Sequence, residues 1–223
     1  MAEKWMDNFD PFGWFERYFS SRTLHLLIRG AIMGVLLVFL IQRLGAYQRY
    51  WFKPLWAAET LVFLVFLVSY AVRTDPVSRS RGVGEIVLPL LGGVLPFALL
   101  GTPPHPAVIS SLTYLYIIFI SMTAATVLTI WGLWTIRRSF SITVEVRELV
   151  VGGPYRFVRH PVYLGEILTA CAIAVLRFSI VNVGVLLLFA AIQLYRSRME
   201  ENKLAGVYPA YRDFAARSRW FWR

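Results

Sequence analysis

The sequence is poor in charge and in cysteine. Only 16% of its 223 residues are charged, against about 25% in soluble proteins, while 57% are apolar and the mean hydropathy is +0.57. A soluble domain of this composition would expose large apolar patches, and sixteen Phe, eleven Tyr and eight Trp exclude a disordered chain. The single cysteine, Cys171, excludes an internal disulfide. The composition therefore predicts an integral membrane protein, which we expect to form one domain over residues 1–223.

Metal ligands and a nucleotide-binding loop are also missing. The three histidines share no metal-ligand spacing, so we expect no metal site. The nearest match to a glycine-rich nucleotide loop, Gly82-x-Gly84, lacks the third glycine and a preceding strand. A net charge of +10 would indicate nucleic acid in a soluble protein, but here the basic residues flank apolar runs. We therefore expect contact with membrane lipids rather than nucleic acid.

The apolar runs predict an all-α, polytopic membrane bundle of about six transmembrane helices. Crossing the ~30 Å hydrocarbon layer takes about 20 helical residues. Four runs approach or exceed this length, at 24–41, 55–72, 83–101 and about 108–136. Two shorter runs, 162–176 and 180–195, are separated only by Arg177-Phe178-Ser179 and predict a helical hairpin. In the third run, prolines and a Gly92-Gly93 pair predict a kink that can shape a cavity.

The basic residues predict the topology of the bundle. Six crossings place both termini on one side, which then carries 18 Lys and Arg against four on the other. This asymmetry predicts that both termini are cytoplasmic. Residues 5–20 mix aromatic and charged side chains and predict an interfacial segment. We accordingly divide the domain into an N-terminal part, 1–136, with four transmembrane helices, and a core, 137–223, that carries the chemistry.

The polar stretch 137–165 differs from everything before it. It holds five basic residues, a Gly-Gly-Pro turn and the step from His160 to Pro161. Pro161 is suited to the first position of a helix, which makes His160 the cap. The free N–H groups of that turn and the helix dipole would form an anion site, strengthened by Arg156 and Arg159. A simple membrane-surface anchor explains the local pattern equally well.

A second unusual stretch, residues 195–213, follows the last apolar run. Arg196 and Glu200 are spaced to share one helix face, and Glu201 comes next. By itself this pattern indicates a solvated helix end with a surface ion pair worth under ~1 kcal/mol. If the two short helices form a hairpin, however, the stretch returns to the turn at His160. Acidic, basic and tyrosine side chains would then converge, as they do around a polar ligand.

Together these residues resemble the isoprenylcysteine carboxyl methyltransferase family, and the related phospholipid N-methyltransferases share the C-terminal pattern. The resemblance covers roughly residues 137–215. The spacer between the glutamate pair and the first tyrosine is shorter than is usual in the family, so the resemblance assigns no role to either tyrosine. The residues that carry it are Gly153-Pro154-Tyr155, Arg159-His160-Pro161-x-Tyr163-x-Gly165, Glu200-Glu201-x-x-Leu204 and Tyr208-x-x-Tyr211.

The resemblance implies S-adenosylmethionine as the cofactor, bound in a cytoplasmic pocket. Glu200 would accept the ammonium group of the cofactor, and the turn at His160 would hold its carboxylate. The segment 147–150 would contribute mainly its backbone. The family's substrate-facing arginine falls on Arg196. By position, the cofactor-binding residues would be Arg147, Glu148, Leu149, Val150, Tyr155, Arg159, His160, Pro161, Val162, Tyr163 and Glu200.

The acceptor that the resemblance directly implies is a prenylcysteine-type carboxylate, whose lipophilic tail would enter between the helices. A phospholipid amine or a small thiol fits almost as well. Arg196 would position a carboxylate, which needs no general base, whereas an amine needs one, with Glu201 or Glu166 as candidates. Two alternatives belong to other classes: an NADPH-dependent sterol-type reductase, which has a similar Arg-His-x-x-Tyr element, and a non-enzymatic scaffold that binds anionic lipid.

Overall fold

The computed structural model describes residues 21–74, 76–78, 80 and 84–220, with side chains from residue 30 onward. The predicted interfacial segment 5–20 lies outside this part of the chain. Within it the regular elements are helical, and β-pairing is limited to two isolated bridges, Ser78 with Val146 and Val158 with Arg219. The prediction of an all-α protein is confirmed for these residues.

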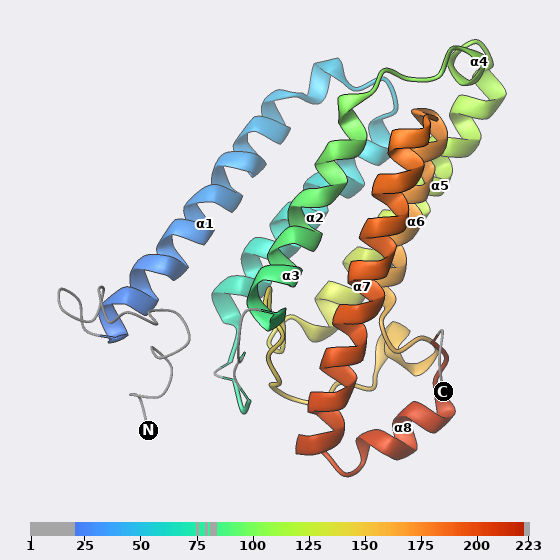
Figure 1. The fold of residues 1–223 in the computed structure, drawn as a ribbon. Helices are drawn as coiled ribbons and strands as arrows, with labels where there is room; N and C mark the ends of the chain where they lie inside the picture. Colours follow the sequence, from blue (N-terminus) through green and yellow to red (C-terminus); the bar gives the residue numbers. More distant parts are fainter. Residues whose placement is uncertain (1–20, 75, 79, 81–83, 221–223) are drawn as a thin grey trace.

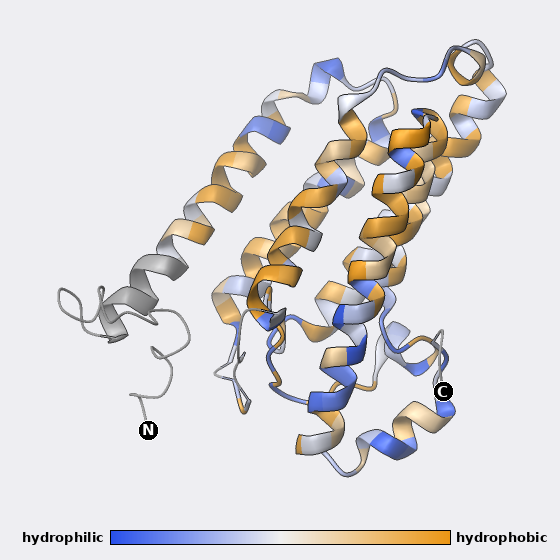
Figure 2. Cartoon of the chain, viewed as in Figure 1, coloured by the Kyte–Doolittle hydropathy of each residue, from blue (hydrophilic) through white to orange (hydrophobic). Residues whose placement is uncertain are grey.

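Four helices are long and apolar enough to cross a membrane: α2 (Lys53–Val72), α3 (Gly84–Val94) with its continuation η3 (Leu95–Gly101), α5 (Leu112–Ile136) and α7 (Ile180–Val207). Two shorter apolar helices accompany them, Gly30–Gly45 of α1 (Ser21–Gly45) and α6 (Pro161–Leu176). Large apolar side chains such as those of Leu112, Ile180 and Leu187 face outward, 67%, 85% and 65% exposed. The protein is therefore a multi-pass membrane protein, apolar along the bundle and hydrophilic at one end (Figures 1 and 2).

The third apolar run changes its helix type near the residues that predict a kink. The α-helix gives way to a 3-10 helix at Leu95, next to Pro96 and just after the Gly92-Gly93 pair. The fourth run is divided into α4 (Pro106–Ile109) and α5, because the Ser111 side chain accepts a hydrogen bond from the Tyr114 N–H and caps α5.

The last apolar run ends well before its helix does. The apolar run 180–195 covers only the first part of α7, which continues to Val207 and carries Arg196, Glu200 and Glu201. Residues 196–206 are rich in Arg, Glu, Lys, Met and Ala, which favour helix without being apolar. Hydropathy therefore marked where the membrane-spanning part ends, and the helix carries the polar residues onward.

Helices α6 and α7 form the predicted hairpin. Ser179 caps α7 by accepting the Asn182 N–H at 3.1 Å. The Asn182 side chain then donates to the carbonyls of Leu99 and Arg177, at 3.1 and 2.7 Å, which ties the hairpin turn to η3. The hairpin returns α7 to the opposite end of the bundle, where α1 also begins (Figure 1).

Glycines hold α6 against α5. A Cβ at Gly165 would lie 2.7 Å from the Ala125 carbonyl oxygen, and one at Gly132 would lie 2.7 Å from Val162 Cγ2. Both distances are shorter than real Cβ contacts allow, so the close approach of the two helices depends on glycine at each position. This packing places the first turn of α6, with Val162 and Tyr163, in the main core cluster together with Leu133 of α5.

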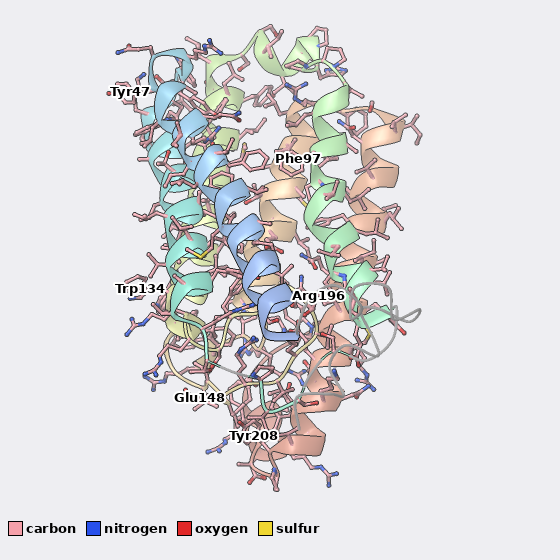
Figure 3. The ribbon with its side chains drawn as sticks, turned by 90° about the vertical axis from the view of Figure 1, so that its left-hand side faces the viewer. Tyr47, Phe97, Trp134, Glu148, Arg196 and Tyr208 are labelled. Atoms are coloured by element: carbon pink, nitrogen blue, oxygen red, sulfur yellow. The ribbon has the colours of Figure 1, made fainter. Side chains whose placement is uncertain are left out.

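The polar end of the bundle is closed by connecting segments. These are the loop 137–160, which contains η4 (Gly153–Arg156), and α8 (Tyr211–Arg217) after α7. Glu148 of the loop and Tyr208, just after α7, lie at the polar end of the bundle. Tyr47 of η2 (Tyr47–Arg49) lies at the opposite end, and Arg196 lies between the two ends (Figure 3). Backbone hydrogen bonds from Val77 and Ser78 to Val146, 2.7 and 3.1 Å long, attach the loop to the connection after α2.

Candidate active site

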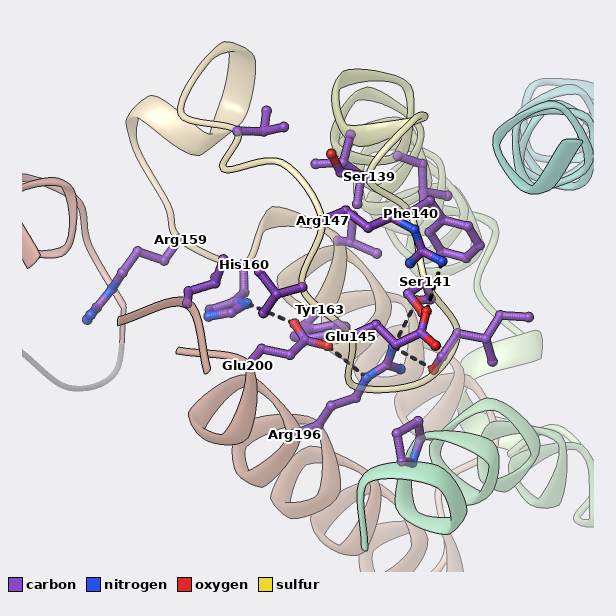
Figure 4. A pocket seen from close by; sticks show the side chains of 18 of the residues that line it. Ser139, Phe140, Ser141, Glu145, Arg147, Arg159, His160, Tyr163, Arg196 and Glu200 are labelled. Atoms are coloured by element: carbon purple, nitrogen blue, oxygen red, sulfur yellow. Dashed lines mark hydrogen bonds and ion pairs between the residues drawn. The ribbon is translucent and has the colours of Figure 1, made fainter. Parts of the chain in front are cut away.

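A cavity of about 230 Å³ lies where α2, α3, α5, α6 and α7 meet the loop 137–160. Figure 4 shows Ser141, Glu145, Tyr163, Arg196 and Glu200 converging on it from the loop, α6 and α7. Most of the residues predicted from the sequence line this cavity: Arg147, Glu148, Leu149, Val150, Tyr155, Arg159, His160, Val162, Tyr163, Arg196 and Glu200. Pro161 and Glu201 lie behind the lining.

The start of α6 has the predicted form. Pro161 is in the first turn and His160 is the N-cap, but the His160 side chain makes no capping hydrogen bond. The first N–H groups of a helix have no partner within the helix. Those of Val162 and Tyr163 therefore have no partner within the helix, and both residues line the cavity at the helix end where the dipole favours a negative group.

Glu201 braces the loop that precedes α6. Its two oxygens lie 3.2 Å from Arg159 Nη1 and 3.0 Å from His160 Nε2. All three side chains are less than 10% exposed. The carboxylate of α7 thus fixes the Arg-His pair of the loop, and these contacts occupy both of its oxygens.

Glu200 turns toward the cavity instead. Its Oε1 accepts hydrogen bonds from the Tyr163 hydroxyl and from Arg196 Nε, the latter at 3.2 Å. Its Oε2 lies 3.9 Å from His160 Nδ1. The rings of His160 and Tyr163 stack with centroids 5.4 Å apart. His160 is therefore held between the two glutamates, with Glu201 behind it and Glu200 in front.

Arg196 joins α7 to the loop over the cavity. Its Nη2 donates to the carbonyl oxygens of Ser141 and Ile142, at 3.3 and 2.9 Å, and its guanidinium lies 4.9 Å from the centre of the Tyr163 ring. Among the described residues, no hydrogen bond of Arg196 uses Nη1. One donor of this buried cation is therefore left for a ligand.

The segment 147–150 reaches the cavity because Arg147 anchors it. Its guanidinium is buried, donates to the Thr74 carbonyl at 2.6 Å and pairs with Glu145 at 2.8 Å. The Tyr208 hydroxyl donates to the Arg147 carbonyl. The side chain of Arg147 thus holds the loop in place, whereas the predicted contribution of residues 147–150 to cofactor binding is made by their backbone.

Two tyrosines of the lining have perturbed acidity. Burial, together with the negative charge of Glu200, raises the pKa of Tyr155, and burial beside Glu201 raises that of Tyr211. Both phenols are therefore neutral at any physiological pH and contribute surface and hydrogen bonding rather than charge. Tyr155 follows Gly153, whose φ of +56° is favourable for glycine.

Sequence reasoning missed several residues around the cavity. Glu145 and Ser141 gave no signal beyond their place in the polar loop, and Gln193 was hidden within an apolar run. Trp220 also gave none: its ring lies 5.1 Å from that of His160, and its indole N–H donates to Ser197 Oγ at 3.0 Å. The pairing of Val158 with Arg219 holds the neighbouring backbone beside the loop. Tyr211, left without a role by the resemblance, lines the cavity.

Comparison with known proteins supports the resemblance. Residues 107–206 match the model of the Isoprenylcysteine carboxyl methyltransferase (ICMT) family. No curated protein and no solved structure matches the chain significantly. The matched residues run from α4 through α5, the loop 137–160 and the α6–α7 hairpin, and so include most of the cavity wall.

The cavity is chemically suited to the cofactor of this family, S-adenosylmethionine. That molecule carries an ammonium, a carboxylate, a sulfonium and an adenosine group. The cavity offers the Glu200 carboxylate, the uncapped first turn of α6 and apolar surface from Leu149, Leu204 and Phe214. Over residues 107–206 the chain matches the isoprenylcysteine carboxyl methyltransferase family, whose members are membrane methyltransferases that use S-adenosylmethionine.

Proposed function

We propose that the chain methylates the carboxylate of a prenylcysteine-type amphiphile. The observation that carries this proposal is the position of Arg196, a buried cation that lines the cavity with Nη1 unused among the described residues. A carboxylate acceptor would bind this donor. The apolar residues Phe66, Pro89 and Leu133 line the same cavity from the membrane-spanning helices and would receive the start of a lipophilic tail.

The residues predicted to bind the cofactor have complementary tasks in this proposal. Glu200 accepts its ammonium group, the first turn of α6 accepts its carboxylate, and the loop 147–150 with Tyr155 surrounds the remainder. Glu201 acts through Arg159 and His160, which it holds in place. The sulfonium of S-adenosylmethionine supplies an electrophilic methyl group, and transfer to a carboxylate oxygen leaves a neutral thioether with no proton to move.

Arg196 contributes by orientation. Holding an acceptor in line and excluding water supplies roughly 7–11 kcal/mol in well-aligned reactions. The guanidinium is itself held by Glu200 and by two loop carbonyls, so an acceptor carboxylate bound to Nη1 would have a defined direction. A cavity enclosed by helices also keeps bulk water from the reacting groups.

A phospholipid amine is the second candidate acceptor. Such an acceptor needs a general base, and Glu201 is unsuited because Arg159 and His160 occupy it behind the lining. Glu166 does line the cavity and would be the base for an amine. Carboxylate methylation is preferred because it uses Arg196 and requires no proton transfer.

We further propose that the cavity faces the cytoplasm. The positive-inside asymmetry of the sequence supports this orientation. The end of the bundle where α1 begins and α7 ends is also the end that carries the cavity (Figure 1).

The cofactor site is tested by titrating the detergent-solubilised protein with S-adenosylhomocysteine. We expect micromolar affinity for the wild type and at least about a tenfold loss in His160→Ala and in Glu200→Ala, since a charge-assisted hydrogen bond contributes about 1.5–3 kcal/mol. His105→Ala, at the far end of the bundle, and Asp213→Ala, exposed on α8, are matched controls that should bind like the wild type. Unchanged binding in both site variants would remove the proposed site.

The acceptor class is tested with a radiolabelled methyl donor. N-acetyl-S-farnesylcysteine and phosphatidylethanolamine are supplied separately in mixed micelles. We expect label in the first compound only, as a methyl ester that releases labelled methanol in base. Label in phosphatidylethanolamine that resists base would instead establish the amine reaction.

A further inference from the structure

The deep end of the cavity holds two oxygen acceptors that lack donors. Gln193 of α7 donates its side-chain N–H to Glu166 Oε2 of α6, and both residues line the cavity. Gln193 is 1% exposed, and its Oε1 has no hydrogen-bond partner among the described residues. Within the same part of the chain, Gln193 is also the only hydrogen-bond partner of Glu166. Gln193 Oε1 is therefore a buried acceptor without a donor, and Glu166 Oε1 is a second acceptor to which no described residue donates.

These oxygens lie nearer the middle of the membrane than Arg196. Gln193 precedes Arg196 by three residues on α7, and Glu166 follows Tyr163 by three residues on α6. Three helical residues correspond to about 4.5 Å along the axis and return to the same helix face. Arg196 and Tyr163 are in contact, so the Glu166–Gln193 pair occupies the next level of the cavity toward the membrane. On the α3 side, Gly92 packs against this level: a Cβ there would lie 3.5 Å from Gln193 Oε1.

Unpaired acceptors at membrane depth are costly. A buried polar group without a partner, such as Gln193 Oε1, is unfavourable for the folded protein, and an ionisable residue at membrane depth, such as Glu166, marks a functional site by default. No lysine or arginine donates to Glu166 in the described residues. The missing donors are therefore expected to come from the ligand that fills the cavity.

We propose that Glu166 and Gln193 bind the nitrogen of the acceptor, by sharing the hydrogen bond that the N–H next to its carboxylate donates. This inference rests on the proposed function, because Arg196 is taken to bind that carboxylate. In a cysteine derivative the nitrogen and the carboxylate are both attached to Cα. The carboxylate can therefore bind Arg196 while the nitrogen lies beside the Glu166–Gln193 pair. The pair thus makes the enzyme selective for S-alkylated cysteine over a carboxylic acid that has the same tail but no nitrogen.

The order of the charges favours this acceptor over an aminophospholipid. In phosphatidylethanolamine the phosphate lies nearer the tails and the amine farther from them. With the tails toward the membrane and the phosphate on Arg196, the amine would point away from Glu166. In a prenylcysteine the Cα nitrogen can lie on the membrane side while the carboxylate points toward the cofactor end. The arrangement of Arg196 above Glu166 and Gln193 therefore matches the cysteine derivative.

The test compares two acids on the full-length wild-type protein in detergent. N-acetyl-S-farnesylcysteine and S-farnesylthiopropionate share the tail, the thioether and the carboxylate, and differ by the acetamido nitrogen. We expect kcat/KM to be at least about tenfold higher for the nitrogen-bearing acid, because the other acid leaves the buried Gln193 Oε1 unpaired. Equal values would overturn the inference and leave the proposed function standing. Methylation of neither acid would overturn both.

Two variants test whether Glu166 and Gln193 cause the preference for the nitrogen-bearing acid. In Gln193→Leu and in Glu166→Gln, the ratio of kcat/KM between the two acids should fall toward one. Tyr195→Phe, on the exposed side of α7, is the matched control and should keep the wild-type ratio. Binding of S-adenosylhomocysteine establishes that each variant is folded. A wild-type ratio retained in both site variants would place nitrogen recognition elsewhere and overturn the assignment.

Discussion

Neighbouring residues of the site perform different tasks. Glu200 and Glu201 are adjacent on α7, yet Glu200 contacts Tyr163 and Arg196 at the cavity while Glu201 contacts Arg159 and His160 behind it. Successive residues on an α-helix point about 100° apart, so two glutamates in a row necessarily face different surroundings. The motif predicted that an acidic pair belongs to the site, but the division of labour within the pair follows from the rotation of α7.

The first prediction concerns the buried carboxylate. Glu201→Leu removes the negative partner of Arg159, which is 4% exposed, and should destabilise the fold by about 3–5 kcal/mol. Thermal unfolding of the purified protein in detergent would show this as a lower Tm. Asp213→Leu, on the exposed face of α8, is the control and should change stability by less than about 0.5 kcal/mol. Equal Tm values for the two variants would contradict the bracing role of Glu201.

At the scale of elements, the site depends on how closely α6 approaches α5. Gly132 and Gly165 permit this approach, and the first turn of α6 supplies both the uncapped N–H groups and His160 at the N-cap. A shift of α6 would separate its first turn from Glu200 of α7. Helix packing and cofactor binding are therefore coupled, although neither glycine lines the cavity.

Alanine at Gly165 tests this coupling. Its Cβ would meet the Ala125 carbonyl of α5 at 2.7 Å, so Gly165→Ala should destabilise the protein by about 1–3 kcal/mol and weaken S-adenosylhomocysteine binding. Gly184→Ala, on α7 with open space around it, is the matched control and should not lower Tm, because alanine favours helix over glycine. If the two variants behave alike in melting and titration, the close packing is not required.

At the scale of the whole molecule, the two ends of the bundle are chemically unlike. One end carries the cavity, the long polar loop, α8 and the polar continuation of α7 (Figure 2). The other carries the short connections, including the hairpin turn held by Asn182. Most Lys and Arg belong to segments at the first end. Charge distribution and site position therefore agree on which end should face the cytoplasm.

Cysteine labelling tests this orientation. In a Cys171→Ser background, Arg212→Cys places a thiol on α8, and Ala107→Cys places one on α4 at the other end; both positions are exposed. A membrane-impermeant maleimide applied to intact cells should label position 107 and should reach position 212 only after permeabilisation. The reverse pattern would invert the topology and place the cavity outside the cytoplasm.

The sequence alone determined the membrane class, the helical fold of the described residues, the hairpin and many of the residues that line the cavity. Hydropathy and motif spacing can be read along the sequence. They are sufficient to predict the long apolar helices and the start of α6 at the His160-Pro161 step. They did not reveal the length of α7, because its polar part is helical through the helix propensity of its residues and not through an apolar pattern.

Only the tertiary structure decided which groups meet across the chain. Lys203 of α7 pairs with Glu85 of α3, 118 residues away, and Trp220 meets His160 through a backbone bridge that no side-chain pattern encodes. The Glu166–Gln193 pair likewise arises from the register of the α6–α7 hairpin, and Gly92 of α3 packs against its unsatisfied Gln193 oxygen. Such contacts depend on helix rotation and on packing distance, and these are set by the folded bundle as a whole.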